Sequence, residues 1–521
     1  MQEHLLSILI FLPLVGALLL ISWPGKDDLF YRKLAIGVAG LQFALVTATS
    51  LFGQFPIEKA TWFVIAGANQ EYFSAGYHVA LDGLNFPLFW LSSFIMLIAL
   101  VASGKIKTQL KGYYALMLVL HTAVSGTFAA VDFLLFYVFF EFMLIPMYFL
   151  IGIWGSEKRE YAALKFFIYT LSGSLFILVG MILLYISVQQ TGTVEGIRVH
   201  TFDLEALTGL KGLIPGSLLD PSLNVNFWGL SATSWVFLLL LTGFAIKVPV
   251  VPFHTWLPDA HVESPTPVSV ILAALLLKTG TYGIIRFACL ILPGAFLEFT
   301  TLLSGMAVLS ILYGALNALA AKDLKRMIAY SSISHMGFVI LGIAATTSMA
   351  IQGAIFQMVS HGLISAMLFL LVGSLQERTQ DRTISNYSGL FSKMPIYSSM
   401  ILIGFFAGMG IPGFASFIGE VLVLLGAFNS SNIAGWLPLT ATIGILLSAG
   451  YFSWTIQRMF FGPFQSKVGG SFEDLNNAER WPFFILSFLI LLLGIYPAPL
   501  LDIISGFSES WPNALLNSGL K

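Results

Sequence analysis

Four ionisable residues lie deep inside apolar stretches of the chain, where a charge is costly. They are two acids and two bases, namely Glu141, Lys247, Lys278 and Glu420. A charge at the centre of a membrane helix costs roughly 2.5–3.5 kcal/mol on insertion scales, so such residues need a partner, water or a function. Burial disfavours the charged form, whereas a nearby opposite charge favours it, so a movable lysine can reset the proton affinity of an acid. These residue types therefore point to proton transfer, with Lys165 as a fifth candidate nearer to a helix end.

Glu141 has a simpler alternative reading, which is a single ion pair that holds two helices together. Buried ion pairs are poor stabilisers, because desolvation of both charges offsets their attraction. We therefore favour a carboxylate on a proton path, and the structural ion pair stays open as the alternative.

Three histidines also occur in apolar stretches: His121, His335 and His361. A lone buried histidine is more often a hydrogen-bonded core residue than a ligand. Here, however, serines accompany the histidines along the chain, and an imidazole titrates near neutral pH. We predict that these polar steps link Lys278 to Glu420 as a proton relay. The serines are Ser331, Ser332, Ser334 and Ser360.

The stretch GFAIKVPVVPFHTWLPDAHVESPTPVSVILAALLLK, residues 243–278, predicts how two of the lysines are positioned. Proline removes a backbone donor and clashes with the preceding helical turn. The apolar helix that reaches Lys247 should therefore break just past this lysine, where it meets three prolines, and a second helix should carry Lys278. The prolines are Pro249, Pro252 and Pro258.

A polar cluster follows this break, and it consists of His254, Asp259, His261 and Glu263. These residue types could ligate a metal, but prolines divide the cluster, and it sits at the end of a broken helix. We interpret it as a polar cap or a proton entrance, with His254, His261 and Glu263 as additional site candidates and no metal site.

The composition is that of a membrane protein. Of the 521 residues, 57% are hydrophobic and 10% are charged, and the mean hydropathy is +0.87. Soluble domains carry about 25% charged residues. We therefore predict an all-α polytopic membrane protein in which residues 1–521 form one membrane domain.

Apolar runs of about 20 residues mark membrane spans. About fourteen are expected, near 5–22, 34–52, 84–103, 113–130, 132–154, 163–187, 233–251, 266–289, 297–318, 326–345, 352–374, 397–426, 434–459 and 481–499. Two longer segments between spans, 53–83 and 189–232, are expected to be packed loops with short strands or surface helices.

The basic residues predict the orientation of these spans. Eighteen of the 25 Lys and Arg fall in one set of alternate loops, and that side is expected to face inward. This arrangement requires an even number of spans, with both termini and both long loops on the outer side. The few outer basic residues are Lys59, Arg198, Lys211, Arg286 and Lys521.

A second broken helix is expected within 404–426, where GMGIPG places three glycines and Pro412 inside an apolar run. The letters match a dinucleotide-binding motif, but no strand precedes them, so we interpret them as a helix break. A weak internal similarity pairs 166–178 with 355–367. Paired broken helices in two halves are typical of inverted repeats with a site at the bilayer midplane.

Other classes of chemistry find little support. Cys289 is the single cysteine, which excludes internal disulfides and cysteine-held iron–sulfur clusters. The histidines do not form the regular facing pairs that hold haem. The net charge is -1 and the basic residues are dispersed, so nucleic acid is not an expected partner.

Several of these segments together resemble one family over nearly the whole chain. They are FEFMLIPMYFLIGIWG, KVPVVPFHTWLPDAHVESPTPVSVILAALLLKTGTYG, KDLKRMIAYSSISHMGF, MVSHGLISAMLFLLVG and IPGFASFIGE. The chain resembles the antiporter-like subunits of proton-pumping NADH:quinone oxidoreductase, respiratory complex I and its photosynthetic relative, with greatest similarity to the subunit M (subunit 4) type. The wider family includes multisubunit sodium/proton antiporters.

The resemblance implies fourteen helices in two inverted five-helix repeats, 113–289 and 297–459, with discontinuous helices 7 and 12. It implies that Glu141 and Lys247 form a switching charge pair on helices 5 and 7. Lys278 would be the central carrier and Glu420 the acid near the exit. His335 and His361 would be the connecting relay.

The function implied is proton translocation driven by quinone reduction elsewhere in a larger complex. The chain would act as a translocase subunit without redox chemistry of its own, and quinone, flavin and iron–sulfur clusters would lie in partner subunits. Expected partners are other membrane-arm subunits, including neighbouring antiporter-like subunits, and lipids. The membrane would be a bacterial plasma membrane or a thylakoid membrane, with ferredoxin as donor and plastoquinone as acceptor in the photosynthetic form. A sodium/proton antiporter subunit, a non-conducting scaffold, and a haem- or quinone-binding oxidoreductase remain alternatives.

Overall fold

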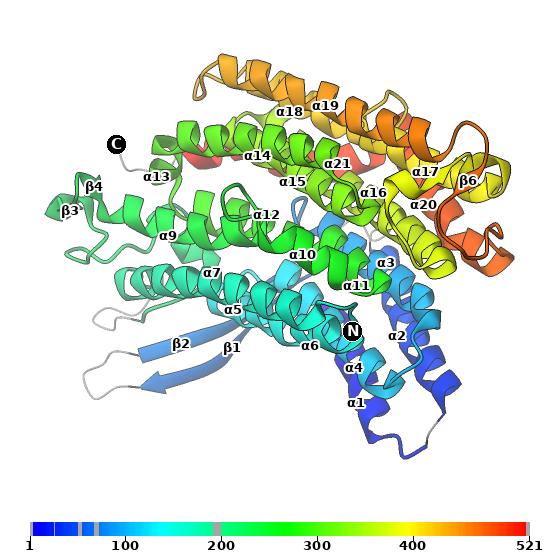
Figure 1. The fold of residues 1–521 in the computed structure, drawn as a ribbon. Helices are drawn as coiled ribbons and strands as arrows, with labels where there is room; N and C mark the ends of the chain where they lie inside the picture. The colour runs from blue at the N-terminus through cyan, green and yellow to red at the C-terminus, as the bar shows by residue number, and fades with distance from the viewer. Residues whose placement is uncertain (1–3, 26, 50–54, 67–71, 191–198, 517–521) are drawn as a thin grey trace.

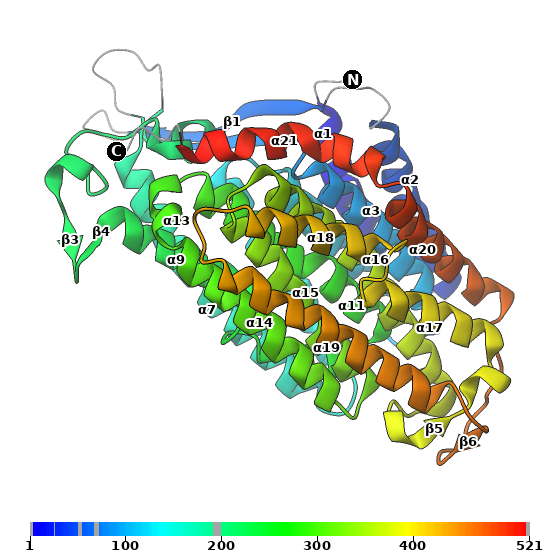
Figure 2. The ribbon, with the colours of Figure 1, turned by 90° about the horizontal axis from the view of Figure 1, so that it is seen from above.

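The computed structural model describes residues 4–25, 27–49, 55–66, 72–190 and 199–516 (Figure 1). Three basic residues used for the orientation prediction, Lys26, Arg198 and Lys521, lie outside the described residues, as does the end of the expected span 34–52. The structure is dominated by long helices that run roughly parallel to one another, with short strands at the ends of the bundle (Figures 1 and 2).

The first part of the chain forms a group of four helices and a hairpin. The helices are α1 (Leu5–Ser22), α2 (Asp28–Thr49), α3 (Phe86–Ala102) with the short η3 (Ser103–Lys105), and α4 (Leu110–Ala129). The antiparallel hairpin consists of β1 (Ile57–Ala66) and β2 (Tyr72–Ala80). A bridge from Val79 to Ala130 fixes the hairpin at the end of α4.

The next part contains the first broken helix. The elements are α5 (Phe133–Phe142), α6 (Leu144–Trp154), α7 (Arg159–Ser187), α9 (Ala232–Lys247), α10 (Trp256–Glu263), α11 (Thr266–Ile271), η6 (Leu272–Leu276), α12 (Leu277–Gly283) and η7 (Ile284–Cys289). The loop before α9 holds α8 (Leu204–Leu207), η4 (Thr208–Leu210), η5 (Pro221–Leu223), β3 (Asn226–Phe227) and β4 (Leu230–Ser231). The expectation of short strands and surface helices in the two long loops is therefore confirmed.

The second half contains the other broken helix. Its helices are α13 (Pro293–Glu298), α14 (Thr300–Ala320), α15 (Leu324–Ala344), α16 (Ser348–Thr379), α17 (Pro395–Gly408), α18 (Ala415–Phe428), α19 (Trp436–Met459), α20 (Asn477–Ile495) and α21 (Ala498–Leu516). Short elements at one end are η8 (Ile384–Asn386), β5 (Tyr387–Ser388), η9 (Leu390–Ser392) and β6 (Gln465–Ser466).

Each predicted apolar span overlaps a helix or a broken helix of the structure. By length and hydropathy alone, 10 of the described helices could cross a membrane, or up to 11 if the bent pair α20 and α21 is one span. The count of fourteen and the repeat boundaries therefore remain predictions. The sequence interpretation missed α21, which packs on α16, α13 and α3 after a bend of 63° from α20 (Figure 2).

The prolines break the chain after Lys247 as predicted, but not at every position. The helix ends at Lys247, and the next one begins at Trp256, so Pro249 and Pro252 lie in the break. Pro258 lies outside the break and is the third residue of α10. In the first turn of a helix the missing proline N–H has no intrahelical partner to lose.

The two ends of the bundle differ in charge. Asp132 caps the N-terminus of α5, and the backbone bridge to Asp203 places the loop before α9 at this same end, near the hairpin. Lys158 and Arg159 lie beyond the other end of the α5–α6 span, beside Arg382 in a shared cavity. We call this second end, with its clustered basic loops, the basic end.

Burial decides which helices can carry a polar path. The most apolar stretches of the segment Thr266–Cys289 and of helix α16 are wholly buried inside the chain, and that of α15 is nearly so. By contrast, α1, α2, α7 and α19 expose apolar side chains over much of their length. The charged residues of the central helices are therefore shielded from lipid by the chain itself.

Candidate functional site

Lys278 lies at the centre of the buried segment, on α12 between two π-helical turns, η6 and η7. Its ammonium group donates to the carbonyl of Ala273 at 2.7 Å and lies 2.7 Å from Nδ1 of His361. Such π-helical turns are frequent at functional sites, because the wider turn re-aims side chains and backbone carbonyls. Here the wide turn ends just before Lys278, and the carbonyl of Ala273, five residues earlier in the chain, accepts a hydrogen bond from the Lys278 ammonium group.

A chain of titratable groups continues from Lys278 across three helices. The rings of His361 on α16 and His335 on α15 lie 5.6 Å apart, centroid to centroid. Nδ1 of His335 lies 3.1 Å from Oε1 of Glu420 on α18. All four side chains are buried, at 6% exposure or less. The structure thus brings together four of the six predicted proton-path residues.

Two side chains that the sequence interpretation missed complete the surroundings of Glu420. Gln357 and Ser416 each donate to its Oε1, at 3.3 Å and 2.9 Å, and Gln357 also donates to Ser416 at 3.0 Å. Helical spacing could have indicated both. Gln357 precedes His361 by four residues on α16, and Ser416 precedes Glu420 by four residues on α18, so each pair shares a helix face.

The break between α17 and α18 makes room for this carboxylate. Gly410 has a φ of +71°, and a Cβ at this position would lie 2.7 Å from Oε2 of Glu420. Gly413 also has a positive φ, of +94°, but nothing lies within 4 Å of its Cβ position. Glycine populates this region freely, whereas other residues are strained there. Gly410 is therefore needed both for the turn and for the approach of Glu420.

Glu141 and Lys247 occupy a second polar position, at the far side of the buried segment. The Lys247 ammonium lies 5.0 Å and 5.6 Å from the ring centroids of Phe140 and Phe166. Glu141 interacts with the hydroxyl of Ser174 and electrostatically with Lys247, but within the described chain the two charges form no ion pair at 4.0 Å or less. The predicted pair is therefore near but not in contact, and aromatic rings surround its ammonium group.

Close backbone packing joins the two polar positions. A Cβ added at Gly280, two residues after Lys278, would lie 3.1 Å from the carbonyl oxygen of Phe244 and 3.1 Å from the amide nitrogen of Val248. Helix α12 thus lies directly against the end of α9, where Lys247 is located. Both lysines are on adjoining helices, with Lys247 1% exposed and Lys278 fully buried.

The side chains of the four residues of the polar cluster after the first break interact with different partners. Asp259 accepts from Lys165 at 2.8 Å and from Arg326 at 3.0 Å, and Glu263 accepts from the backbone N–H of Lys158 at 2.9 Å. The two histidines turn elsewhere. His254 packs edge-on against Tyr313, and His261 stacks on Phe369 with ring centroids 4.5 Å apart. Among the residues that the structure describes, no group of three or more His, Cys, Asp or Glu could hold a metal ion.

A polar cavity of about 1050 Å³ opens at the basic end beside this cluster. Glu263, Asp323 and Arg382 are among the residues that line it. The nearby Lys325 is 2% exposed and donates to the carbonyl of Ser264 at 2.6 Å. His261 lies within electrostatic range of both Lys325 and Lys278. Of the residues predicted as a polar cap or entrance, Glu263 therefore lines this cavity, and His261 is fully buried.

Comparison with known proteins gives one consistent result. The sequence profile described as NADH:quinone oxidoreductase/Mrp antiporter, TM, matches residues 130–447. The chain is 37% identical over 508 residues to NADH-quinone oxidoreductase subunit M of Rickettsia bellii, and this alignment covers 96% of the chain and 97% of the relative.

Two solved structures share the fold. A chain of respiratory complex I from Thermus thermophilus is 31% identical, with a TM-score of 0.80, and the match covers 98% of this chain and 99% of that one. A chain of the Mrp complex from Dietzia is 19% identical, with a TM-score of 0.81, and covers 99% of both chains. The second likeness concerns the fold alone.

Proposed function

Because the chain belongs to the NADH:quinone oxidoreductase/Mrp antiporter transmembrane family, we propose that it is a proton-translocating membrane subunit of a quinone-reducing complex of the complex I type. The observation that carries this proposal is the buried sequence Lys278, His361, His335 and Glu420, in which neighbouring groups lie at hydrogen-bonding or ring-stacking distance. Electron transfer takes place in partner subunits, where the flavin, iron–sulfur clusters and quinone are bound. This chain supplies buried groups that bind and release protons.

The charge arrangement suggests how a signal from the rest of the complex reaches this line. When Lys247 approaches Glu141, the pair neutralises itself, and the electrostatic influence of Lys247 on Lys278 falls. When the pair separates, the ammonium of Lys247 disfavours a second positive charge on Lys278. The proton of Lys278 then passes to His361 and on to His335 and Glu420. Lys278 is reloaded from the basic end, by way of the polar cavity and His261.

The energy required is within reach of such a switch. Moving one charge against 100 mV costs about 2.3 kcal/mol. A shift of one pKa unit corresponds to about 1.36 kcal/mol, so shifts of two units on a buried group are sufficient. We place uptake at the basic, inner end and release at the outer end of a bacterial plasma membrane or a thylakoid membrane, with both termini on the outer side.

Substitution of Glu420 in the assembled complex tests this function. After reconstitution into vesicles, Glu420→Gln should lower quinone-linked proton uptake by at least about tenfold, because an amide does not titrate in place of the carboxylate. The control is Glu509→Gln, which changes the same group at an exposed position on α21. Equal proton uptake in both variants, with normal assembly, would support a non-conducting scaffold instead.

Sodium/proton antiport is the second candidate function, because the family description and the shared fold include the Mrp antiporter. The two functions differ in what drives transport and in the ion required. Proton uptake that depends on quinone reduction and continues without sodium favours the first function. Uptake driven by a sodium gradient in the absence of electron donor favours the second.

A further inference from the structure

A second, smaller cavity opens at the basic end, between α2, α3, α16 and α20. Its volume is about 310 Å³. Its lining combines apolar side chains with four charged ones, Arg32, Lys105, Glu377 and Glu479, which we call the rim. The apolar residues are Val101, Ala102, Leu370, Pro482 and Phe483. The cavity therefore offers charged groups for a polar headgroup and an apolar surface for hydrocarbon chains.

Arg32, near the start of α2, is the rim residue with spare donors. Its guanidinium group donates to the carbonyl of Val101 at 3.4 Å and lies against the backbone of Gly104, where an added Cβ would be 2.7 Å from its nitrogen. Within the described residues no carboxylate pairs with it. A guanidinium carries five N–H donors in a planar fork that suits phosphate oxygens. Most of its donors therefore remain available to an anion.

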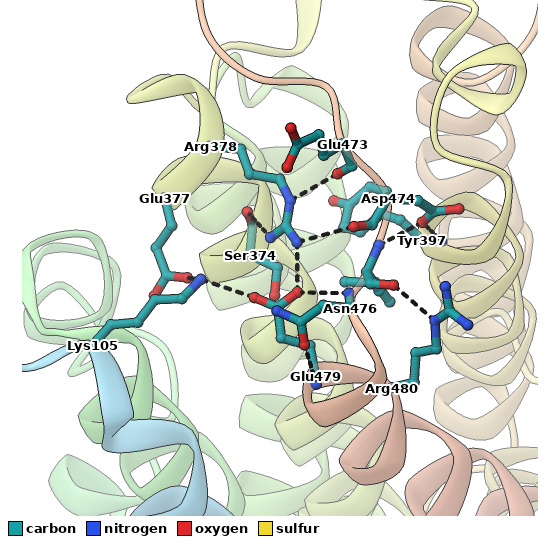
Figure 3. A network of polar contacts seen from close by, with 11 residues as sticks. Lys105, Ser374, Glu377, Arg378, Tyr397, Glu473, Asp474, Asn476, Glu479 and Arg480 are labelled. Atoms are coloured by element: carbon teal, nitrogen blue, oxygen red, sulfur yellow. Dashed lines mark hydrogen bonds and ion pairs between the residues drawn. The ribbon is translucent and has the colours of Figure 1, made fainter.

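The acids beside the cavity are already neutralised by other cations (Figure 3). Glu377 pairs with Lys105, and Glu479 pairs with Lys105 at 2.9 Å and also with Arg378. Together with Arg32, this group contains three cations and two carboxylates, which leaves a net charge of +1. The charge left over is located at Arg32.

The position of the cavity is that of the lipid headgroups. Trp481, near the start of α20 and beside Pro482, is 67% exposed, and tryptophan is enriched where the membrane meets water. Basic pockets between transmembrane helices on the inner side bind anionic headgroups. We propose that this cavity binds the phosphate of an anionic phospholipid, with Arg32 as its principal ligand and the acyl chains along Pro482 and Phe483.

Native mass spectrometry of the purified, delipidated full-length chain tests this site. The added probes are phosphatidylglycerol, phosphatidylcholine and inorganic phosphate. Phosphatidylglycerol should bind wild type more tightly than phosphatidylcholine, and Arg32→Gln should weaken its binding about tenfold, as expected for the loss of a charge-assisted contact. Lys33→Gln removes the same charge at the next, exposed position and should leave binding unchanged.

A variant with the opposite expected effect keeps the test decisive if Arg32→Gln folds poorly. Glu377→Gln removes one rim carboxylate and raises the local net charge, so it should strengthen phosphatidylglycerol binding. The proposal is overturned if Arg32→Gln and Lys33→Gln bind alike, or if wild type shows no headgroup preference and Glu377→Gln changes nothing. Equal binding of inorganic phosphate would mean an anion site and would contradict a lipid site.

Discussion

At the scale of single residues, proton transfer depends on how the carboxylate of Glu420 is accommodated in the middle of a membrane domain. Glu420 is 3% exposed, and Ser416, Gln357 and His335 all lie at hydrogen-bonding distance from its Oε1. Its other oxygen approaches the backbone at Gly410. A buried acid can gain and lose a proton only if the polar groups around it rearrange when its charge changes. The break between α17 and α18 allows this rearrangement, because its backbone does not form the regular hydrogen bonds of a helix.

Two glycines of this break give a matched test at the residue scale. Gly410→Ala and Gly413→Ala both place Ala at a positive φ and should each cost about 1 kcal/mol of stability. Only the first also pushes a methyl group against Glu420. We expect Gly410→Ala to lower proton uptake severalfold more than Gly413→Ala at equal assembly. Equal uptake in the two variants would mean that the contact between Gly410 and Glu420 has no role.

Among the site residues, those whose type is unusual for a membrane could be predicted from sequence. Glu141, Lys247, Lys278 and Glu420 stand out, because a charge in an apolar run is rare and costly. Gln357 did not stand out, since a neutral amide carries no such signal. The gap between Glu141 and Lys247 could not be predicted either, because it depends on the aromatic rings of Phe140 and neighbouring helices.

At the scale of elements, prolines and glycines predicted where the two broken helices end, whereas packing decided the rest. The π-helical turns around Lys278 leave no mark in an apolar run, because they arise from backbone carbonyls and neighbouring helices. Helix α21 was missed because its sequence is amphipathic, with Asp502 and Glu509 among apolar residues. An amphipathic helix packed on the chain falls below the hydropathy that marks a membrane span.

The close contact between α16 and α18, which carry His361 and Glu420, gives a prediction at the element scale. A Cβ at Gly426 would lie 2.4 Å from the backbone nitrogen of Ala350, whereas nothing lies within 4 Å of a Cβ at Gly450 on α19. Gly450→Ala should raise the unfolding temperature slightly, since Ala is better than Gly in a helix by about 0.5–1 kcal/mol. Gly426→Ala should lower it by forcing the two helices apart. A higher unfolding temperature for both variants would contradict this packing.

The hairpin, at the end opposite the basic end, gives a second prediction at this scale. Burial alone would raise the pKa of Asp203, but hydrogen bonds from His78 and Lys59, at 3.2 Å and 2.6 Å, hold it well below its usual range. An acid with a lowered pKa stabilises the fold above its unfolded pKa, and this contribution is lost as the pH falls.

The measurement for the hairpin is thermal unfolding of wild type and Asp203→Asn in detergent. Wild type should be the more stable at pH 7, and the difference should shrink as the pH falls below about 4, the ordinary pKa of an aspartate. A difference that stays constant down to pH 3 would mean that the charge of Asp203 does not clamp β1 and β2 to the loop before α9.

At the scale of the whole molecule, the arrangement separates a polar interior from a lipid-facing exterior. The helices that carry Lys278, His335 and His361 are surrounded by others that expose apolar side chains. Cavities open at the basic end, and the hairpin and the loop before α9 lie at the other end. This layout follows from composition only in outline, because a hydropathy profile does not tell which helices lie inside.

The central claim is that protons follow one polar route through the middle of the molecule, from the polar cavity at the basic end through Lys278 to Glu420. It is tested most directly by a map of the assembled complex, obtained by electron cryo-microscopy at a resolution that shows ordered water. Ordered waters should bridge the polar cavity to Lys278 by way of His261 and extend the hydrogen-bonded groups from Lys278 to Glu420. Tightly packed hydrocarbon between the polar cavity and Lys278, with no water in any turnover state, would contradict this route.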